Sequence, residues 1–281
     1  MRAPPDAPDA GFMRRLGMTM AWFGATLVRK PRHSRSADAR RALAMRRFWQ
    51  LTAAGALIIG LMFFVDVLAI SAMPVRGAPQ LWPVRLYTDL AENAVFLVPI
   101  SAGLILIAVK SAVSASPFIR GVLAGLSVRL TYIAFAVLVP SLITKLTKGA
   151  IGRGRPFVGG EANAFNFHPF AGDVRFESMP SGHATTAFAA AFAISAVWPQ
   201  TRTVMWIYAG LIAVSRVVLL AHHPSDVVTG AVVGILGAVL VQHWFASRGL
   251  AFVIGADGRV VALPGPGLVD LKRVVGGRAA P

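Results

Sequence analysis

Long apolar runs alternate with short polar segments along this 281-residue chain. A helix needs about 20 mainly apolar residues to cross a bilayer, and six runs reach or approach that length. The runs are residues 48–70, 94–113, 121–145, 184–198, 203–221 and 224–247. The pattern therefore predicts an all-α fold, a bundle of six transmembrane helices.

The run 184–198 is the shortest of the six and is rich in alanine. We expect this helix either to extend back into the polar motif that precedes it or to lie where the membrane is thin, packed closely by its neighbours.

The composition agrees with a membrane protein: 56% of the residues are hydrophobic and 14% are charged, whereas about a quarter are charged in a typical soluble domain. The chain has no cysteine, which excludes disulfides, thiolate metal sites and a cysteine nucleophile. Its net charge of +16 resembles that of a nucleic-acid-binding protein, but the basic residues map to loops between apolar runs. We therefore expect the lipid bilayer as a partner and no nucleic acid. The sequence predicts no particular protein partner.

The basic residues also predict an orientation. Residues 1–47 hold 11 Lys and Arg against three Asp, and such a flank stays in the cytoplasm. With six spans, both termini then lie inside, and the inner side carries 19 of the 28 basic residues. Eight basic residues fall in outer loops. Two of these loops hold the candidate catalytic motifs described below, so we attribute their excess of Lys and Arg to function.

The segments outside the spans carry weaker signals. Residues 11–28 resemble a short signal sequence without a convincing cleavage site, and we favour an amphipathic helix on the inner leaflet. Residues 31–47 are polar and basic, and we expect a mobile topology anchor that attracts anionic lipid. Residues 249–263 contain two β-type runs around an Asp-Gly turn, which predicts a small cytoplasmic hairpin. The expected organisation is a basic N-terminal segment 1–47, a six-span domain 48–247 and a tail 248–281.

The first chemical motif, KGAIGRGRP, lies between the third and fourth runs. It places Lys148 seven residues before Arg155, and the glycines between them allow the backbone to fold the two cations toward one point. By itself the motif is a weak signal, because most basic, glycine-rich loops are simply solvated.

The second motif, MPSGH, lies at the head of the fourth run. Ser181 is a favourable N-cap, and Gly182 leaves its backbone amide exposed. The helix N-terminus would thus offer N–H groups and a positive dipole end to a phosphate. The alternative is a plain helix cap followed by an incidental His183.

The third motif, SRVVLLAHHPSD, joins the fifth run to the sixth. Arg216 lies near the end of an apolar helix, where a charge needs a partner or a ligand. His222 and Asp226 are four residues apart, a spacing that on one helical turn puts a carboxylate beside the imidazole and so orients it and stabilises its cation. We expect His223 to have a structural role.

Together the three motifs resemble the signature of the type 2 phosphatidic acid phosphatase superfamily, which includes lipid phosphate phosphatases, bacterial acid phosphatases and vanadium haloperoxidases. The resemblance spans residues 148–226, and the six-span layout is similar to that of the family's membrane branch. The matching positions are Lys148, Arg155, Pro156, Pro180, Ser181, Gly182, His183, Ser215, Arg216, His222 and Asp226.

The resemblance implies a reaction without a divalent metal or other cofactor. His222 would attack phosphorus and form a phosphohistidine, Asp226 would hold its other ring nitrogen, and His183 would act as general acid and then base. The phosphate-binding residues would be Lys148, Arg155, Ser181, Gly182 and Arg216. Preorganised donors of this kind typically contribute on the order of 3 kcal/mol each to catalysis.

The implied substrate is a membrane lipid phosphate. The candidates are undecaprenyl diphosphate, phosphatidic acid, phosphatidylglycerol phosphate and the 1-phosphate of lipid A. The expected location is the bacterial cytoplasmic (inner) membrane, with the site on the outer, periplasmic face. Of the other conspicuous residues, Asp66 could line the site, but we favour an interfacial residue that meets water, and we read His168 as incidental.

Three alternatives remain beside a lipid phosphatase. A haloperoxidase shares the motifs but has no reason to carry six spans. A phosphotransferase shares the phosphohistidine step and differs only in the acceptor. A non-enzymatic transporter or binding protein would use the basic residues to hold an anionic headgroup, but it does not explain the spacing of His222 and Asp226.

Overall fold

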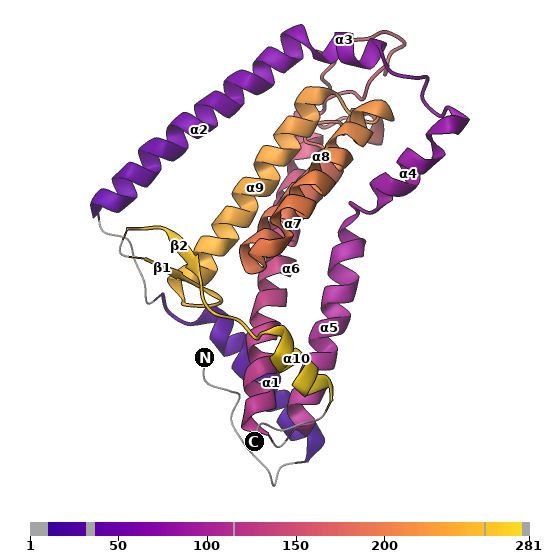
Figure 1. The fold of residues 1–281 in the computed structure, drawn as a ribbon. Coiled ribbons are helices and arrows are strands. Elements are labelled where there is room, and N and C mark those ends of the chain that lie inside the picture. The colour runs from indigo at the N-terminus through magenta and orange to yellow at the C-terminus, as the bar shows by residue number, and fades with distance from the viewer. Residues whose placement is uncertain (1–10, 32–36, 115, 256, 277–281) are drawn as a thin grey trace. The chain divides into compact units, whose positions relative to one another are not determined.

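The structure, a computed structural model, describes residues 11–31, 37–114, 116–255 and 257–276 (Figure 1). It is mostly helical, with one two-stranded antiparallel sheet. The α-helices are α1 (Phe12–Val28), α2 (Ala37–Phe64), α3 (Asp66–Ser71), α4 (Trp82–Asp89), α5 (Asn93–Val113), α6 (Pro117–Ile151), α7 (Gly182–Val197), α8 (Arg202–Val218), α9 (Pro224–Ser247) and α10 (Leu268–Val275). The strands are β1 (Phe252–Ile254) and β2 (Val260–Ala262). Short 3-10 helices are η1 (Pro79–Leu81), η2 (Val174–Phe176) and η3 (Pro199–Thr201).

The chain divides into two compact units, each built from segments that are far apart in the sequence. The first unit comprises Met1–Ser36, Leu97–Ala134 and Gln242–Pro281. The second comprises Ala37–Phe96 and Phe135–Val241. All three chemical motifs belong to the second unit.

Within the described ranges, four helical segments are long and apolar enough to cross a membrane. They are Leu43–Phe64, Pro79–Val113, Pro117–Ile151 and Pro224–Ser247. The predicted fourth span corresponds to a shorter apolar helix, α7, and the predicted fifth span corresponds to α8, which has 17 residues. A mostly helical protein with apolar, membrane-length helices is thus confirmed, and the count of six spans stays a prediction.

Helix α7 begins at Gly182, inside the second motif. The apolar run 184–198 therefore extends back into the polar motif, which was one of the two expectations for it. It packs backbone against backbone with α9. A Cβ on Gly230 would lie 2.4 Å from the carbonyl oxygen of Ser181, and a Cβ on Gly234 would lie 2.4 Å from that of Thr185. Small residues allow such close helix contacts in membrane proteins. The contact brings the N-terminal ends of α7 and α9, which carry two of the motifs, next to each other.

Residues 31–47 were expected to be mobile. Of these, residues 32–36 lie outside the described part of the chain, but from Ala37 onward the segment forms the first turns of α2. The expectation is wrong for that part, because the sequence ADARRALAMRR consists largely of strong helix formers.

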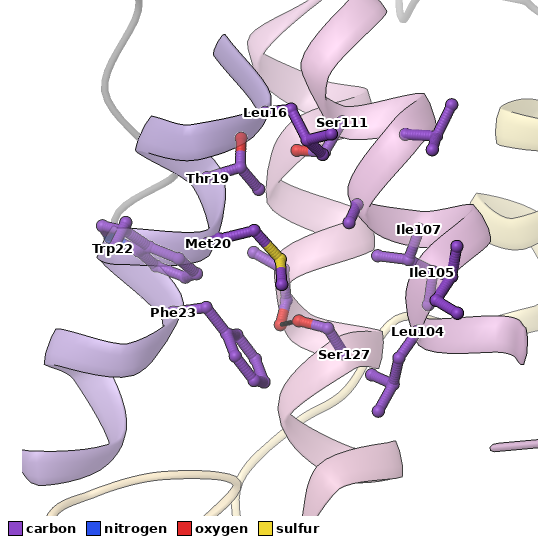
Figure 2. Close-up of a pocket in the computed structure, with 13 residues that line it drawn as sticks. Leu16, Thr19, Met20, Trp22, Phe23, Leu104, Ile105, Ile107, Ser111 and Ser127 are labelled. Carbon is purple, nitrogen blue, oxygen red and sulfur yellow. Dashed lines mark hydrogen bonds between the residues drawn. The ribbon is translucent and has the colours of Figure 1, made fainter. Parts of the chain in front are cut away.

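In the first unit, residues 11–28 form the helix expected there, α1. Side chains of α1, among them Met20 and Phe23, line a mainly apolar cavity of about 310 Å³ together with residues of α5 and α6 (Figure 2). Ser127 on α6 also lines it and donates a hydrogen bond to the carbonyl of Ala124. The location of α1 on the inner leaflet stays a prediction.

The predicted hairpin is confirmed. Strands β1 and β2 are antiparallel, with Phe252 opposite Ala262. At the turn Gly258 has a φ of +76°, and the Arg259 N–H donates to Asp257 Oδ1 at 3.0 Å. A left-handed conformation of this kind favours glycine, which is why the Asp-Gly pair predicted the turn.

The hairpin is tied to the N-terminal half of α6. Arg129 is buried and donates to the carbonyl oxygens of Gly125 and Leu263, each at 2.8 Å. The rings of Tyr132 and Phe252 pack edge to face, 4.7 Å apart. An isolated hairpin is marginally stable, so these contacts explain how a tail of this size is ordered.

Candidate active site

The loop between α6 and α7 carries the first motif and is shaped by Gly152. This glycine has a φ of +63°, and a Cβ there would lie only 2.1 Å from the carbonyl oxygen of His168. The His168 N–H donates to the Gly152 carbonyl at 2.7 Å, and Arg153 forms a β-bridge with Phe167. The close approach requires glycine, and it turns Arg153 into the protein interior.

Arg153 is the centre of a buried ionic network. Its guanidinium lies 2.7 Å from Asp66 Oδ2 and 2.5 Å from Asp226 Oδ1, and all three side chains have no exposed surface. Arg153 also donates to Ser225 Oγ at 2.6 Å, and the Ser225 N–H donates to Asp66 Oδ1 at 2.9 Å. The expectation that Asp66 meets water is therefore wrong. A buried cation that bridges two carboxylates makes the loss of any member costly.

The second oxygen of Asp226 holds the loop and His223. Asp226 Oδ2 accepts hydrogen bonds from Ser178 Oγ at 2.6 Å and from the His223 N–H at 2.8 Å, and it lies 3.1 Å from His223 Nδ1. His222 Nδ1 lies 3.9 Å from the same oxygen. In this structure the carboxylate therefore acts on His222 through charge, and the direct hydrogen bond that the family resemblance implied is made to His223 instead. A structural role for His223 agrees with these contacts.

The tautomer of His222 follows from its hydrogen bond. Its Nδ1 lies 2.7 Å from the carbonyl oxygen of Ser178. A carbonyl can only accept, so Nδ1 carries the proton and Nε2 holds the lone pair of a neutral imidazole. Burial lowers the pKa of His222 well below its ordinary value; Asp226 opposes the shift, and the charge of Arg216 is the first of three cations that add to it. The imidazole is thus kept neutral, with Nε2 unprotonated.

Lys148 brings the first motif to the second. Its Nζ donates to the carbonyl of Glu177 at 3.2 Å, and the same atom is 3.9 Å from the point that a Cβ on Gly182 would occupy. The Ala184 N–H points to Ser181 Oγ at 3.5 Å, which confirms Ser181 as the N-cap of α7. The ammonium group and the positive end of the helix dipole therefore face the same space.

Arg216 from the third motif is positioned by α4. Its Nη1 lies 3.0 Å from Thr88 Oγ1, and Ser215 Oγ donates to the same hydroxyl at 3.0 Å. All three residues are buried. A hydroxyl can orient a guanidinium without neutralising it, so Arg216 keeps its full charge.

The cations of the site lack anionic partners. Among the described residues, Lys148, Arg155 and Arg216 form no ion pair with a carboxylate, and the Nε atoms of Arg155 and Arg216 are buried without a hydrogen bond. Uncompensated positive charge that is buried, as at Arg216, or partly buried, as at Lys148 and Arg155, is unfavourable unless a ligand compensates it. The arrangement suits a multivalent anion such as a phosphate.

The predicted site residues therefore fall in one region of the second unit. Lys148, Gly182 and His183 line one cavity of about 460 Å³, and the charges of Lys148, Arg155 and Arg216 act on His222. Sequence reasoning missed three residues that hold the site together, namely Thr88, Arg153 and Ser178, and it did not favour the site role of Asp66. Across the described ranges, no group of three or more His, Asp or Glu side chains is arranged to hold a metal ion.

Comparison with known proteins points to one family. Residues 129–250 match the family model of the PAP2 superfamily. Over 129 residues the chain is 41% identical to a lipid A 1-phosphatase of Rhizobium johnstonii (45% of this chain, 52% of that protein) and 40% identical to a lipid A 1-phosphatase of Rhizobium etli (45% and 55%). The chain thus spans about half the length of these curated relatives. No solved structure matches.

The matched region contains every motif residue from Lys148 to Asp226. Over residues 129–250 the chain is similar to the PAP2 superfamily, and the resemblance inferred from the motifs is confirmed.

Proposed function

We propose that this protein is an integral membrane lipid phosphatase that works through a phosphohistidine on His222. The observation that carries the proposal is the hydrogen bond from His222 Nδ1 to the Ser178 carbonyl. It leaves the Nε2 lone pair of a neutral imidazole among three cations that have no carboxylate partner, which is the environment a nucleophile needs to attack a phosphate ester.

The reaction has two steps. In the first, His222 Nε2 forms a bond to phosphorus while the bond from phosphorus to the leaving oxygen breaks, and His183 gives that oxygen a proton. In the second, water attacks phosphorus, His183 takes the proton from the water, and the N–P bond breaks to return a neutral His222 and free phosphate. The attacking and leaving groups lie on opposite sides of phosphorus in both steps.

The cations stabilise the charge that spreads over the phosphoryl oxygens. Lys148, Arg155 and Arg216 supply donors from three different segments, and Ser181 and Gly182 add the N-terminal end of α7. Because none of the three cations is neutralised by a carboxylate of the described chain, their charge is available to the transition state. This provides without a divalent metal what paired metal ions provide in other phosphoryl-transfer enzymes.

The relatives' names favour one of the candidate substrates. Both are lipid A 1-phosphatases, so we propose the 1-phosphate of lipid A as the first candidate, ahead of undecaprenyl diphosphate, phosphatidic acid and phosphatidylglycerol phosphate. The proposal includes six spans in the cytoplasmic membrane, with α7 and α8 as the fourth and fifth, both termini in the cytoplasm and the site on the periplasmic face.

Phosphate release by the purified protein in detergent, with EDTA present, tests the proposal. Wild type should hydrolyse at least one of the four candidate lipids, and His222→Ala should lose at least about 10³-fold in turnover because it lacks the nucleophile. His168→Ala, a histidine outside the site, is the matched control and should retain activity. Brief incubation with labelled lipid should trap an acid-labile phosphoenzyme in wild type alone. Equal turnover by His222→Ala would exclude the mechanism.

The same experiment separates the alternatives. A phosphotransferase would produce a phosphorylated lipid when an acceptor lipid is added, whereas a hydrolase produces free phosphate. A non-enzymatic binding protein would show no turnover with any lipid, and its binding of the headgroup would survive His222→Ala.

A further inference from the structure

The cavity beside His183 has a polar wall that the chemistry above does not use. Besides Lys148, Gly182 and His183, its lining includes Asn93 at the start of α5, Ser141 on α6 and Thr186 on α7. His222 does not line it. The cavity therefore lies on the general-acid side of the site.

Two hydroxyls orient Asn93. Thr186 Oγ1 donates to Asn93 Oδ1 at 2.6 Å, and Ser141 Oγ lies 2.9 Å from the same oxygen. Three helices thus contribute to one small network. With Oδ1 occupied, the Nδ2 amino group, for which no partner is found among the described residues, is left to donate to a ligand.

Reaction geometry decides which part of a substrate this cavity receives. In an in-line displacement the leaving oxygen lies opposite the attacking His222 and next to the acid that protonates it. The cavity contains the acid, His183, but not the nucleophile. The chemical group attached to the leaving oxygen must therefore extend into this cavity.

The charges of the cavity wall limit what that group can be. Glu92 and Glu177 line it together with Lys145 and Lys148. Lys148 belongs to the phosphate site, so the rest of the wall carries two carboxylates against the one ammonium group of Lys145. It does not provide the excess positive charge that a second phosphate would require. A neutral group that accepts hydrogen bonds fits the wall better than the second phosphate of a diphosphate.

We propose that Asn93, held by Ser141 and Thr186, is a specificity residue that binds an amide or hydroxyl oxygen of the leaving group, next to the phosphate ester. The preferred substrate class is then a phosphomonoester of a polar alcohol such as an acylated amino sugar, in preference to a polyprenyl phosphate or diphosphate. This rests on the proposed phosphatase function and refines its substrate class.

Binding to a catalytically inactive protein tests this residue separately from turnover. In the His222→Ala background, the Kd for lipid A, for undecaprenyl phosphate and for inorganic phosphate is measured in detergent, with and without Asn93→Leu. Lipid A carries an amide on the carbon beside its 1-phosphate, and undecaprenyl phosphate carries no polar group there. We expect Asn93→Leu to raise the Kd for lipid A about fivefold to tenfold, which corresponds to the loss of one hydrogen bond. The Kd values for the other two ligands should not change.

Two further variants control for a structural effect. Thr186→Val removes a hydroxyl that orients Asn93 and should also raise the Kd for lipid A, by a smaller factor. Thr147→Val makes the same chemical change at a half-buried position of α6 that does not line the cavity, and it should leave the binding of all three ligands unchanged. A uniform weakening of all three ligands would make Asn93 a structural residue and overturn the proposal, as would unchanged lipid A binding or its absence in the parent protein. Failure of wild type to release phosphate would instead count against the phosphatase function.

Discussion

Arg153 and Arg155 are separated by one residue but lie in opposite electrostatic surroundings. Arg153 is fully buried and ion-paired with two carboxylates, and Ser225 and the Ala164 carbonyl complete its hydrogen bonds. Arg155 is partly exposed, forms no ion pair with a carboxylate of the described chain, and has a buried Nε without a partner.

The difference shows how one loop separates folding from chemistry. Charge that is compensated within the chain orders the loop and orients Asp226, and it has no capacity left for a ligand. Charge that is not compensated costs stability in the free protein and is recovered when an anion binds. The two arginines should therefore respond to mutation in opposite ways.

The largest effect is expected for Arg153→Met. It leaves Asp66 and Asp226 buried without a cation, and removal of one partner from such a network costs about 3–5 kcal/mol. We expect a lower yield of folded protein and a lower Tm in detergent, measured by size-exclusion chromatography and thermal unfolding. Arg153→Lys should recover part of the loss, since one ammonium cannot reproduce both forked contacts. A wild-type Tm for Arg153→Met would show that the network does not stabilise the fold.

Arg155→Met should leave the fold intact and reduce catalysis. Removal of one transition-state donor typically lowers kcat by about 10²-fold to 10³-fold, and no carboxylate of the described chain loses a partner. The Tm should stay at the wild-type value or rise above it, because repulsion among the cations is relieved. Turnover of the best lipid and thermal unfolding, measured on the same preparation, check both statements. A lowered Tm with normal kcat would reverse the roles assigned to the two arginines.

The dependence of kcat on pH tests the role of the Arg155 charge, because that charge acts on the pKa of His222. Burial lowers the pKa of His222 in the folded protein, and both attack and folding require its neutral form. With an ordinary histidine pKa of about 6.5, kcat should stay level through that pH and fall only under more acidic conditions. The contribution of His222 to stability is full above about pH 6.5 and is lost as the pH falls toward the lowered folded value. In Arg155→Met the acid limb of kcat should move to higher pH, because the Arg155 charge helps to lower this pKa.

The smallest effect is expected for Arg175→Met. Arg175 pairs with Asp173 at 2.7 Å on the same loop, but its side chain is 73% exposed. Exposed ion pairs contribute little, since water screens them. Tm and kcat should both match wild type, which makes this variant the control for Arg153→Met. A clearly lower Tm would mean that an ion pair in this loop stabilises the fold whether or not it is buried.

That the proposed phosphate-binding residues lie in one region could be predicted from sequence, because fixed spacings tie them to helix ends. Ser181 and Gly182 follow from the rules of helix capping, and Lys148 and Arg155 from a glycine-rich loop. The partners that position them could not be found in this way. Asp66 is 87 residues from Arg153, and no local rule joins them. One signal was present: both are charges placed in or beside apolar segments, where a partner is required.

The role of Asp226 shows a different limit. The four-residue spacing from His222 predicted a direct contact on one helical turn. Helix α9 begins only at Pro224, so His222 precedes the helix and does not share a helical turn with Asp226. The Ser178 carbonyl holds His222 instead. The hairpin of the tail was predictable because its signal, two β-type runs around Asp-Gly, is entirely local. The span count was harder, since α7 and α8 have only 16 and 17 residues.

The contact of Gly230 and Gly234 with the backbone of α7 also bears on mutational tolerance. In a saturation library selected for lipid phosphatase activity, both positions should reject every substitution, as His222 would, although neither glycine touches the proposed substrate. Activity alone would therefore count them among the catalytic residues. A parallel measure of the amount of folded protein in the membrane would separate the two classes, because the glycine variants should be depleted there while His222 variants accumulate normally.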